Sequence, residues 1–167
     1  ATTTFTDSDT TYLAPSAKSG NWTNGSNSYA NGGGFATGTQ NRYQTFSNFG
    51  FSIPANSVIN GIEVQADTWS SNNDFCQLDV DLSWNGGSNW TNQKSTGNLG
   101  NSETTKTLGT SSDNWGRTWG YGDFTNSNFR LRVQHGDSGS ACGGNDSTYL
   151  DFIRAKVTYI SNVAPVI

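Results

Sequence analysis

The segments FCQLDVDLSW (75–84), FRLRVQH (129–135) and YLDFIRAKVTY (149–159) decide the fold of this chain. In each of them, apolar and polar side chains alternate; Leu78, Val80 and Leu82, for example, share one face of the first segment. Such alternation predicts strands with one buried face and one face in water. Further strands are expected at 2–6, 35–39, 42–51 and 62–69. We therefore predict an all-β chain that forms a single antiparallel β-sandwich, jelly-roll-like in type.

Turn-forming residues separate these segments. Pro54 lacks the N–H that a strand ladder needs, so it is expected to end the strand at 42–51, and Gly61 is expected to mark a β-bulge. The stretch from Pro15 to Gly34 has few apolar residues and is predicted to be a long loop. Long ordered loops in compact domains are usually functional, which makes this loop a candidate site.

The composition narrows the class of protein and of partner. The 167 residues carry a formal net charge of −4, which argues against binding to nucleic acid or to an anionic membrane surface. No apolar run of about 18 residues is present, so we expect no membrane insertion. The late basic residues are expected to pair with acids across strands; these are Arg130, Arg132, Arg154 and Lys156. Two cysteines, few lysines and many Asn, Ser, Thr and Gly residues favour an extracellular protein.

The two cysteines lie at the start of a predicted strand and in a glycine-rich loop. A disulfide between Cys76 and Cys142 would tie the loop HGDSGSACGGND to the sheet. In the chain-entropy model such a bridge stabilises by about 3 to 4.5 kcal/mol. The alternative is two buried thiols. No zinc site is expected, because two cysteines and one histidine show no ligand-like spacing.

Five segments in this order resemble a β-sandwich module of large secreted, cell-surface and phage-tail-like bacterial proteins, in which accessory and carbohydrate-binding-like domains are strung together. They are FGFSIPANSVINGIEV, LSWNGGSNWT, TLGTSSDNWGRTW, FTNSNFRLRV and YLDFIRAKVTY. The resemblance covers about Phe46 to Tyr159. It implies an architecture and an extracellular context more than one activity. We expect the module to span residues 1–160, with 161–167 as a linker or the start of a following repeat.

Two patterns suggest catalysis, and neither is sufficient. HGDSG (135–139) resembles the nucleophile loop of chymotrypsin-like proteases, but the single histidine, His135, lies three residues before Ser138 rather than far upstream. Asp79 and Asp81 share a strand face, yet alternation produces such pairs on any solvated strand. We therefore expect no enzymatic activity and assign no catalytic residue.

Calcium is the metal that the sequence favours, because it binds carboxylate and carbonyl oxygens and often holds the loops of β-sandwich modules. The expected ligands are Asp7 and Asp9 near one end of the chain, together with Asp137, Asp146 and Asp151. On this hypothesis the ion ties the two ends of the chain together. The alternative is that these aspartates only cap turns.

The aromatic residues divide into two groups. Trp84, Trp115 and Trp119 lie within the resembling segments and are expected to pack over the core. Others lie in or beside loops rich in Asn and Gly, where a ring could stack on the C–H face of a sugar. The expected ligand-binding residues are Trp22, Tyr29, Trp69, Asn72, Asn73, Asp74, Trp90 and Tyr121.

These features support two functions from different classes. The first is a non-catalytic extracellular module for carbohydrate binding or adhesion, which recognises a polysaccharide or cell-surface glycan. The second is a structural stalk, fibre or filament subunit. Its terminal strands, including the apolar tail SNVAPVI, would self-associate with the open sheet edge of a neighbour.

Overall fold

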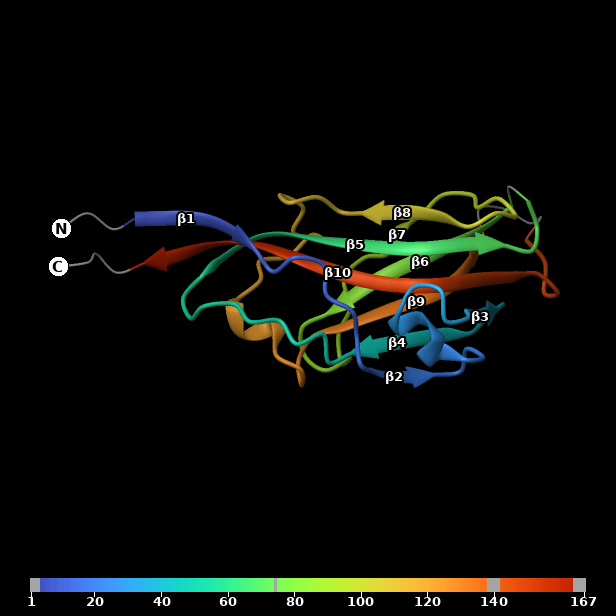
Figure 1. Cartoon of the computed structure of the whole chain (residues 1–167), viewed down its shortest axis with the longest axis horizontal. Coiled ribbons are helices and arrows are strands. Elements are labelled where there is room, and N and C mark those ends of the chain that lie inside the picture. Colours follow the sequence, from blue (N-terminus) through green and yellow to red (C-terminus); the bar gives the residue numbers. More distant parts are fainter. Residues whose placement is uncertain (1–3, 74, 138–141, 164–167) are drawn as a thin grey trace.

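The chain folds into two antiparallel sheets that pack face to face, as Figure 1 shows. The computed structural model describes residues 4–73, 75–137 and 142–163. Within them there are ten strands and two short 3-10 turns, η1 (Gly25–Tyr29) and η2 (Tyr121–Phe124). The predicted all-β antiparallel sandwich is confirmed.

Each sheet contains five of the described strands. The first sheet has the order β1-β10-β5-β8, and β3 also pairs with β10; its members are β1 (Thr4–Asp9), β3 (Ala36–Thr39), β5 (Val58–Ser70), β8 (Thr104–Leu108) and β10 (Ser147–Val163). The second sheet has the order β2-β4-β9-β6-β7; its members are β2 (Ala17–Gly20), β4 (Tyr43–Ser47), β6 (Cys76–Ser83), β7 (Lys94–Ser95) and β9 (Arg130–Asp137).

The core lies between the sheets and consists of the inward side chains of both. Leu78, Val80 and Leu82 of β6 are fully buried, as the alternation predicted. Ile153, Ala155 and Val157 of β10 face them from the first sheet, also with no exposed surface. Burial of aliphatic side chains on this scale is the main source of stability, at about 25 cal/mol per Å² of apolar surface. Trp115 and Trp119 are buried, and Trp84 packs against the core, which confirms their structural role.

The irregularities of the fold agree in part with the sequence predictions. The pairing of β5 with β10 shifts between Thr158 and Tyr159, next to Gly61, so the bulge is confirmed. A Cβ at Gly61 would overlap the backbone at Ser111, which explains the glycine. The predicted loop at 15–34 is interrupted by β2 and η1, and β4 ends at Ser47, well before Pro54.

The outer faces carry the ion pairs that were expected across strands. Arg132 binds the buried carboxylate of Asp81, and Arg154 lies 3.1 Å from Asp67. Lys156 pairs with Glu63 at 3.2 Å. Arg130 instead donates to backbone carbonyls. Among the described residues, no helix has the length and apolar character needed to cross a membrane.

Candidate functional site

Three aromatic rings meet on the outer face of the first sheet, at the end where β5 stops and β10 begins. Trp69 and Tyr149 are directly opposite each other in the β5–β10 register, with ring centroids 5.3 Å apart. Phe35, just before β3, lies edge-on to both at 5.2 and 5.3 Å. Its side chain is 44% exposed. We call Phe35, Trp69 and Tyr149 the aromatic platform.

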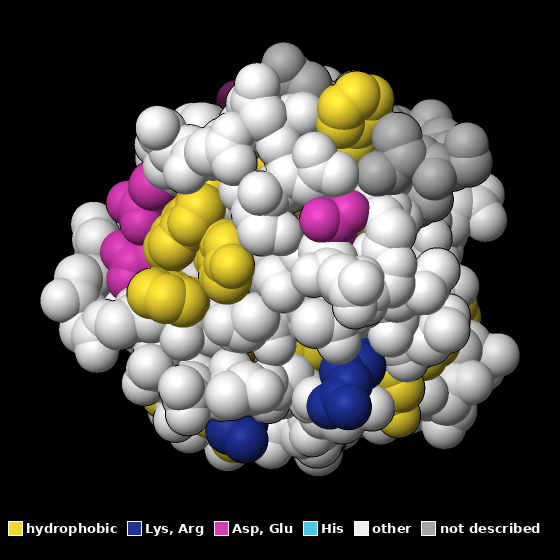
Figure 2. Space-filling view, turned by 90° about the vertical axis from the view of Figure 1, so that its right-hand side faces the viewer, with side chains coloured by type: hydrophobic (Ala, Val, Ile, Leu, Met, Phe, Trp, Pro, Cys, Tyr) yellow, Lys and Arg dark blue, Asp and Glu magenta, His cyan; other side chains and the backbone are white. Residues whose placement is uncertain are grey.

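Acidic side chains lie beside the aromatic platform. Figure 2 looks onto this end of the sandwich, and a group of hydrophobic side chains lies there next to acidic ones. The acids nearest the platform are Asp67 of β5, Asp151 of β10 and Glu103, which precedes β8. The carboxyl groups of Glu103 and Asp151 interact with each other. Desolvation first, and the charges of Asp151 and Asp67 next, raise the pKa of Glu103.

A bulge in β10 determines the position of the Asp151 carboxylate. The β5–β10 register shifts between Leu150 and Phe152, so Asp151 is the extra residue of the strand. Its two oxygens accept hydrogen bonds from the Gly32 N–H at 3.1 and 3.2 Å. Bulges often re-aim a side chain near functional sites. Here the bulge also ties the loop before β3, which carries Phe35, to the sheet.

Asp67 is held more firmly than the other two acids. Thr105 Oγ1 donates to it at 2.6 Å, and the Arg154 guanidinium binds it from the neighbouring strand. The Arg154 group also lies 4.6 Å from the ring centroid of Phe152. Asp67 is only 5% exposed, so its charge is compensated inside the protein. Of the three acids, Glu103 is the exposed one, whereas Asp151 is only 6% exposed.

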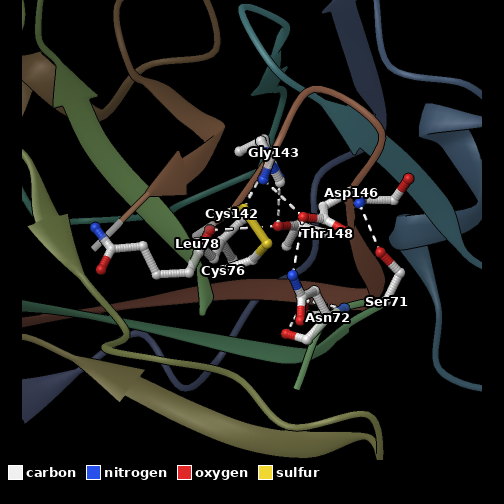
Figure 3. Close-up of a disulfide and its surroundings, with 12 residues drawn as sticks. Ser71, Asn72, Cys76, Leu78, Cys142, Gly143, Asp146 and Thr148 are labelled. Atoms are coloured by element: carbon white, nitrogen blue, oxygen red, sulfur yellow. Dashed lines mark hydrogen bonds between the residues drawn. A yellow bond between two sulfur atoms is a disulfide. The ribbon is translucent and has the colours of Figure 1, made fainter. Parts of the chain in front are cut away.

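The turn after Trp69, which was expected to bind a ligand, instead holds the loop between β9 and β10. Asn72 donates from Nδ2 to Asp146 Oδ2 at 3.0 Å, and its own N–H binds Ser70 Oγ. Figure 3 shows Asn72 and Asp146 next to the disulfide. Asn72 therefore fastens the β9–β10 loop. Asn73 is exposed in the same turn, and Asp74 lies outside the described residues.

The remaining aromatic candidates are not brought together. Trp22 is 5% exposed and donates to the Arg42 carbonyl, so it offers no face to a ligand and that expectation is wrong. Tyr29 packs edge-on against Phe46, and burial raises its pKa. One face of Trp90 is covered by Arg132, 4.0 Å from the ring centroid.

Trp90 also borders a pocket on the outer face of the second sheet. This pocket of about 230 Å³ is lined by Ser19, Tyr43, Thr45, Gly86, Gly87, Trp90, Arg130 and Arg132. Tyr121 is 42% exposed in η2, close to the start of β5, because Gly120 pairs with Val58. It therefore lies at the opposite end of the sandwich from the aromatic platform.

The expected calcium ligands do not form one site. Asp7 pairs with Ile160, nine residues further along β10 than Asp151, which separates them by about 30 Å. Asp9 accepts the Thr11 N–H in a turn at the same end. Asp146 accepts hydrogen bonds from Asn72 and Gly143. Asp7 and Asp9 are therefore not brought together with Asp146 and Asp151, so the hypothesis of one ion that ties the two ends of the chain together is wrong. The side chain of Asp137 lies outside the described residues.

The predicted disulfide between Cys76 and Cys142 is confirmed. It joins the start of β6 to the β9–β10 loop, with the two Cα atoms 5.1 Å apart. Both cysteines are buried. The bridge closes a segment of 66 residues, for which the chain-entropy model gives about 4 kcal/mol.

Sequence reasoning found Trp69 and Asp151 but missed their neighbours. Tyr149 precedes the buried Leu150 in the strand, so alternation predicts that its side chain faces outward. The segment YLDFIRAKVTY already contained this pattern. Phe35 and Glu103 lie outside the strands, and no periodicity predicts where such residues point. Phe35 contacts Trp69 because β3 pairs with β10 next to β5, and Glu103 directly precedes β8, which pairs with β5 on the other side.

Comparison with known proteins gives structural likenesses at low identity. No protein-family model matches the chain, and no curated protein matches it by sequence. Among solved structures, the CBM36-1 domain of a multidomain xylanase from the hindgut metagenome of Trinervitermes trinervoides is 12% identical, with a TM-score of 0.40, over 98% of this chain and 100% of that one.

Two further structures are similar at the same level. A carbohydrate-binding module CBM36 in complex with calcium and xylotriose is 12% identical, with a TM-score of 0.39, over 92% of this chain and 98% of that one. A family two carbohydrate esterase from Cellvibrio japonicus is 12% identical, with a TM-score of 0.36, over 99% of this chain and 37% of that one. Likeness at this level carries no argument about what this chain binds.

Proposed function

We propose that this chain is a non-catalytic carbohydrate-binding or adhesion module, which works outside the cell and recognises a polysaccharide or surface glycan at the aromatic platform. The observation that carries the proposal is the cluster of Phe35, Trp69 and Tyr149, whose rings meet at the surface with Phe35 44% exposed. Exposed aromatic clusters are unusual on soluble proteins and often mark binding sites.

The chemistry of the aromatic platform suits a sugar. A pyranose ring has an apolar C–H face, which packs on an aromatic ring, and hydroxyl groups at its edge, which need acceptors. The rings of Trp69 and Tyr149 are tilted by 33° to each other and together offer a broad apolar surface. The carboxylate of Glu103 is exposed beside them, and hydrogen bonds to charged acceptors are stronger than neutral ones.

We expect the affinity of one such site to be modest. The three rings form a surface platform, and an open surface removes less of a ligand from water than an enclosed pocket does. Repeated sugars on a polysaccharide, or several modules on one surface, would raise the apparent affinity through effective concentration.

A divalent cation such as calcium would find its oxygens at Glu103 and Asp151. Desolvation and the charges of Asp151 and Asp67 raise the pKa of Glu103, so the neighbouring carboxylates repel one another. A cation bound between the two carboxylates would relieve that repulsion, and calcium prefers such oxygen ligands. The cation would then lie beside the aromatic platform, where sugar hydroxyls can complete its coordination.

Affinity electrophoresis against a panel of soluble polysaccharides, with calcium and then with EDTA, tests the proposal. We expect at least one polysaccharide to retard the protein and Trp69→Ala to abolish the retardation. Tyr121→Ala is the matched control, since it removes an exposed ring at the opposite end. If neither polysaccharide binding nor an effect of Trp69→Ala appears, the proposal is wrong.

A structural role is the second candidate, and the shape of the first sheet favours it. The pair β1 and β10 extends beyond the body of the sandwich in Figure 1. Among the described strands, β1 pairs with β10 alone, so its other edge could add a strand from a second copy. Light scattering at several concentrations would reveal such assembly as a rising mass.

A further inference from the structure

The disulfide is in contact with the imidazole of His135. Its Nε2 lies 3.2 Å from Cys142 Sγ, and the ligand atoms of Cys76, His135 and Cys142 all lie within 4.8 Å of one another. His135 reaches this place because it continues the inward face of β9 after Leu131 and Val133. The group closes one end of the core, between the two sheets.

The second nitrogen of the imidazole is held by a residue of the other sheet. Nδ1 lies 2.8 Å from the Thr148 hydroxyl, which in turn donates to the Gln77 carbonyl at 3.3 Å. In the tautomer in which the Thr148 hydroxyl donates to the Gln77 carbonyl, Nδ1 donates its proton to Thr148 and Nε2 carries the lone pair. Figure 3 shows Thr148 beside the two cysteines. This is the arrangement of a metal-binding histidine, in which an outer hydrogen bond fixes the tautomer.

We propose that reduction of the Cys76–Cys142 disulfide converts this group into a site for zinc or a similar thiophilic divalent cation. Two thiolates and one imidazole nitrogen are preferred zinc ligands, at about 2.3 Å for sulfur and 2.0–2.1 Å for nitrogen. They would occupy three tetrahedral positions and leave the fourth for water. The site lies apart from the carboxylates beside the aromatic platform and does not depend on sugar binding.

The geometry requires one movement. In a tetrahedral site the two sulfurs lie about 3.8 Å apart, so they must separate once their bond is broken. Cys142 lies in the β9–β10 loop rather than in a strand, so its sulfur can move while Cys76 stays in β6. The distance from Nε2 to Cys142 Sγ is already within a few tenths of an ångström of the value in a zinc site.

The two cysteines are buried, so a reagent or a metal would reach them past His135. His135 is half-buried and borders a surface pocket of about 230 Å³ together with Asn41, Arg42, Tyr43 and Gln134. A phosphine reductant and one water convert the disulfide into two thiols and a phosphine oxide. The two protons of the water end on the sulfurs. Zinc then displaces both thiol protons into solvent.

The test is a cobalt titration of the phosphine-reduced protein, followed by addition of zinc. We expect near-ultraviolet thiolate-to-cobalt absorption that saturates at one equivalent and disappears with zinc, and no such absorption before reduction. His135→Gln should weaken cobalt binding at least tenfold, and Thr148→Val should weaken it less. Glu103→Gln should leave it unchanged, which separates this site from the carboxylates beside the aromatic platform.

Thermal unfolding keeps the proposal testable if reduction loosens the fold. Loss of the disulfide should lower Tm by roughly 10 °C, and zinc should restore part of that in the wild type but not in Cys142→Ser. The proposal is overturned if the reduced protein shows no absorption with cobalt and no recovery of Tm with zinc. Equal cobalt affinity in His135→Gln would also overturn it.

Discussion

Trp22 is held in the core by the absence of a side chain at Gly38. The two residues lie on neighbouring segments, because Thr23 pairs with Thr37, and a Cβ at Gly38 would overlap the indole ring. Trp69 has the opposite surroundings, with its ring on the outer face among other exposed aromatics. Two tryptophans in similar Asn- and Ser-rich sequence thus have different roles, and the difference is decided by a residue distant in sequence.

Gly38→Ala should therefore destabilise the domain by about 2–3 kcal/mol, because the new methyl group forces the Trp22 ring out of its place. Gly33→Ala is the matched control. A Cβ at Gly33 meets no atom within 4 Å, so a change within about 0.5 kcal/mol is expected. Urea unfolding measures both. Equal stability of the two variants would show that the ring relocates without cost.

Strand β10 organises both the core and the candidate site. It pairs with β1, β3 and β5, and its single extra residue at Asp151 separates the part that carries Tyr149 from the part that carries Phe152. The residues on either side of the bulge keep consistent partners, Leu150 with Thr68 and Phe152 with Asp67. The bulge is thus a one-residue insertion in β10, and the second shift in this pairing lies at the other end of β5, next to Gly61.

Deletion of Asp151 should leave the pairing of Tyr149 with Trp69 intact, since the flanking partners become consecutive. We expect it to cost no more than about 1 kcal/mol beyond Asp151→Ala, because both variants lose the hydrogen bonds from Gly32. Urea unfolding of each variant measures this. A deletion that unfolds the domain while Asp151→Ala folds would show that the bulge sets the register.

Sequence periodicity predicted the elements far better than the site. The inward faces of β6, β9 and β10 follow from alternation alone, and so does the outward position of Tyr149. The bulge at Gly61 followed from glycine in a strand. The bulge at Asp151 did not, because an aspartate in a strand carries no local sign of an inserted residue. The meeting of Phe35 with Trp69 depends on strand order, which short-range patterns do not contain.

On the scale of the whole molecule, ionisable side chains make the stability of the fold depend on pH, both at low and at high pH. Hydrogen bonds from Asn72 and Gly143 lower the pKa of Asp146. Burial opposes the shift at Asp113, but Lys94 and the Trp115 N–H outweigh it and lower that pKa as well. Burial likewise opposes the shift at Lys156, and the hydrogen bond and charge of Glu63 raise its pKa above 10.5.

The directions of these three pKa shifts define the pH range in which they stabilise the fold. The two aspartates stabilise the fold above their unfolded pKa near 3.8, and this is lost as pH falls through their lower folded values. Lys156 stabilises below 10.5, and this is lost as pH rises through its folded value. We expect Tm to fall less steeply between pH 5 and pH 2 in Asp146→Asn than in the wild type. Parallel curves would mean that Asp146 has the same pKa in both states.

The two ends of β10 pair with different strands, so the two ends of the domain differ. The β1–β10 ribbon, where Thr4 pairs with Val163, projects from one pole, and the aromatic platform lies towards the other. A tether attached through either strand would therefore leave the platform facing away from the attachment point. Coupled to a solid support by either end, the molecule should present the same surface to the solution, so its orientation would not have to be engineered.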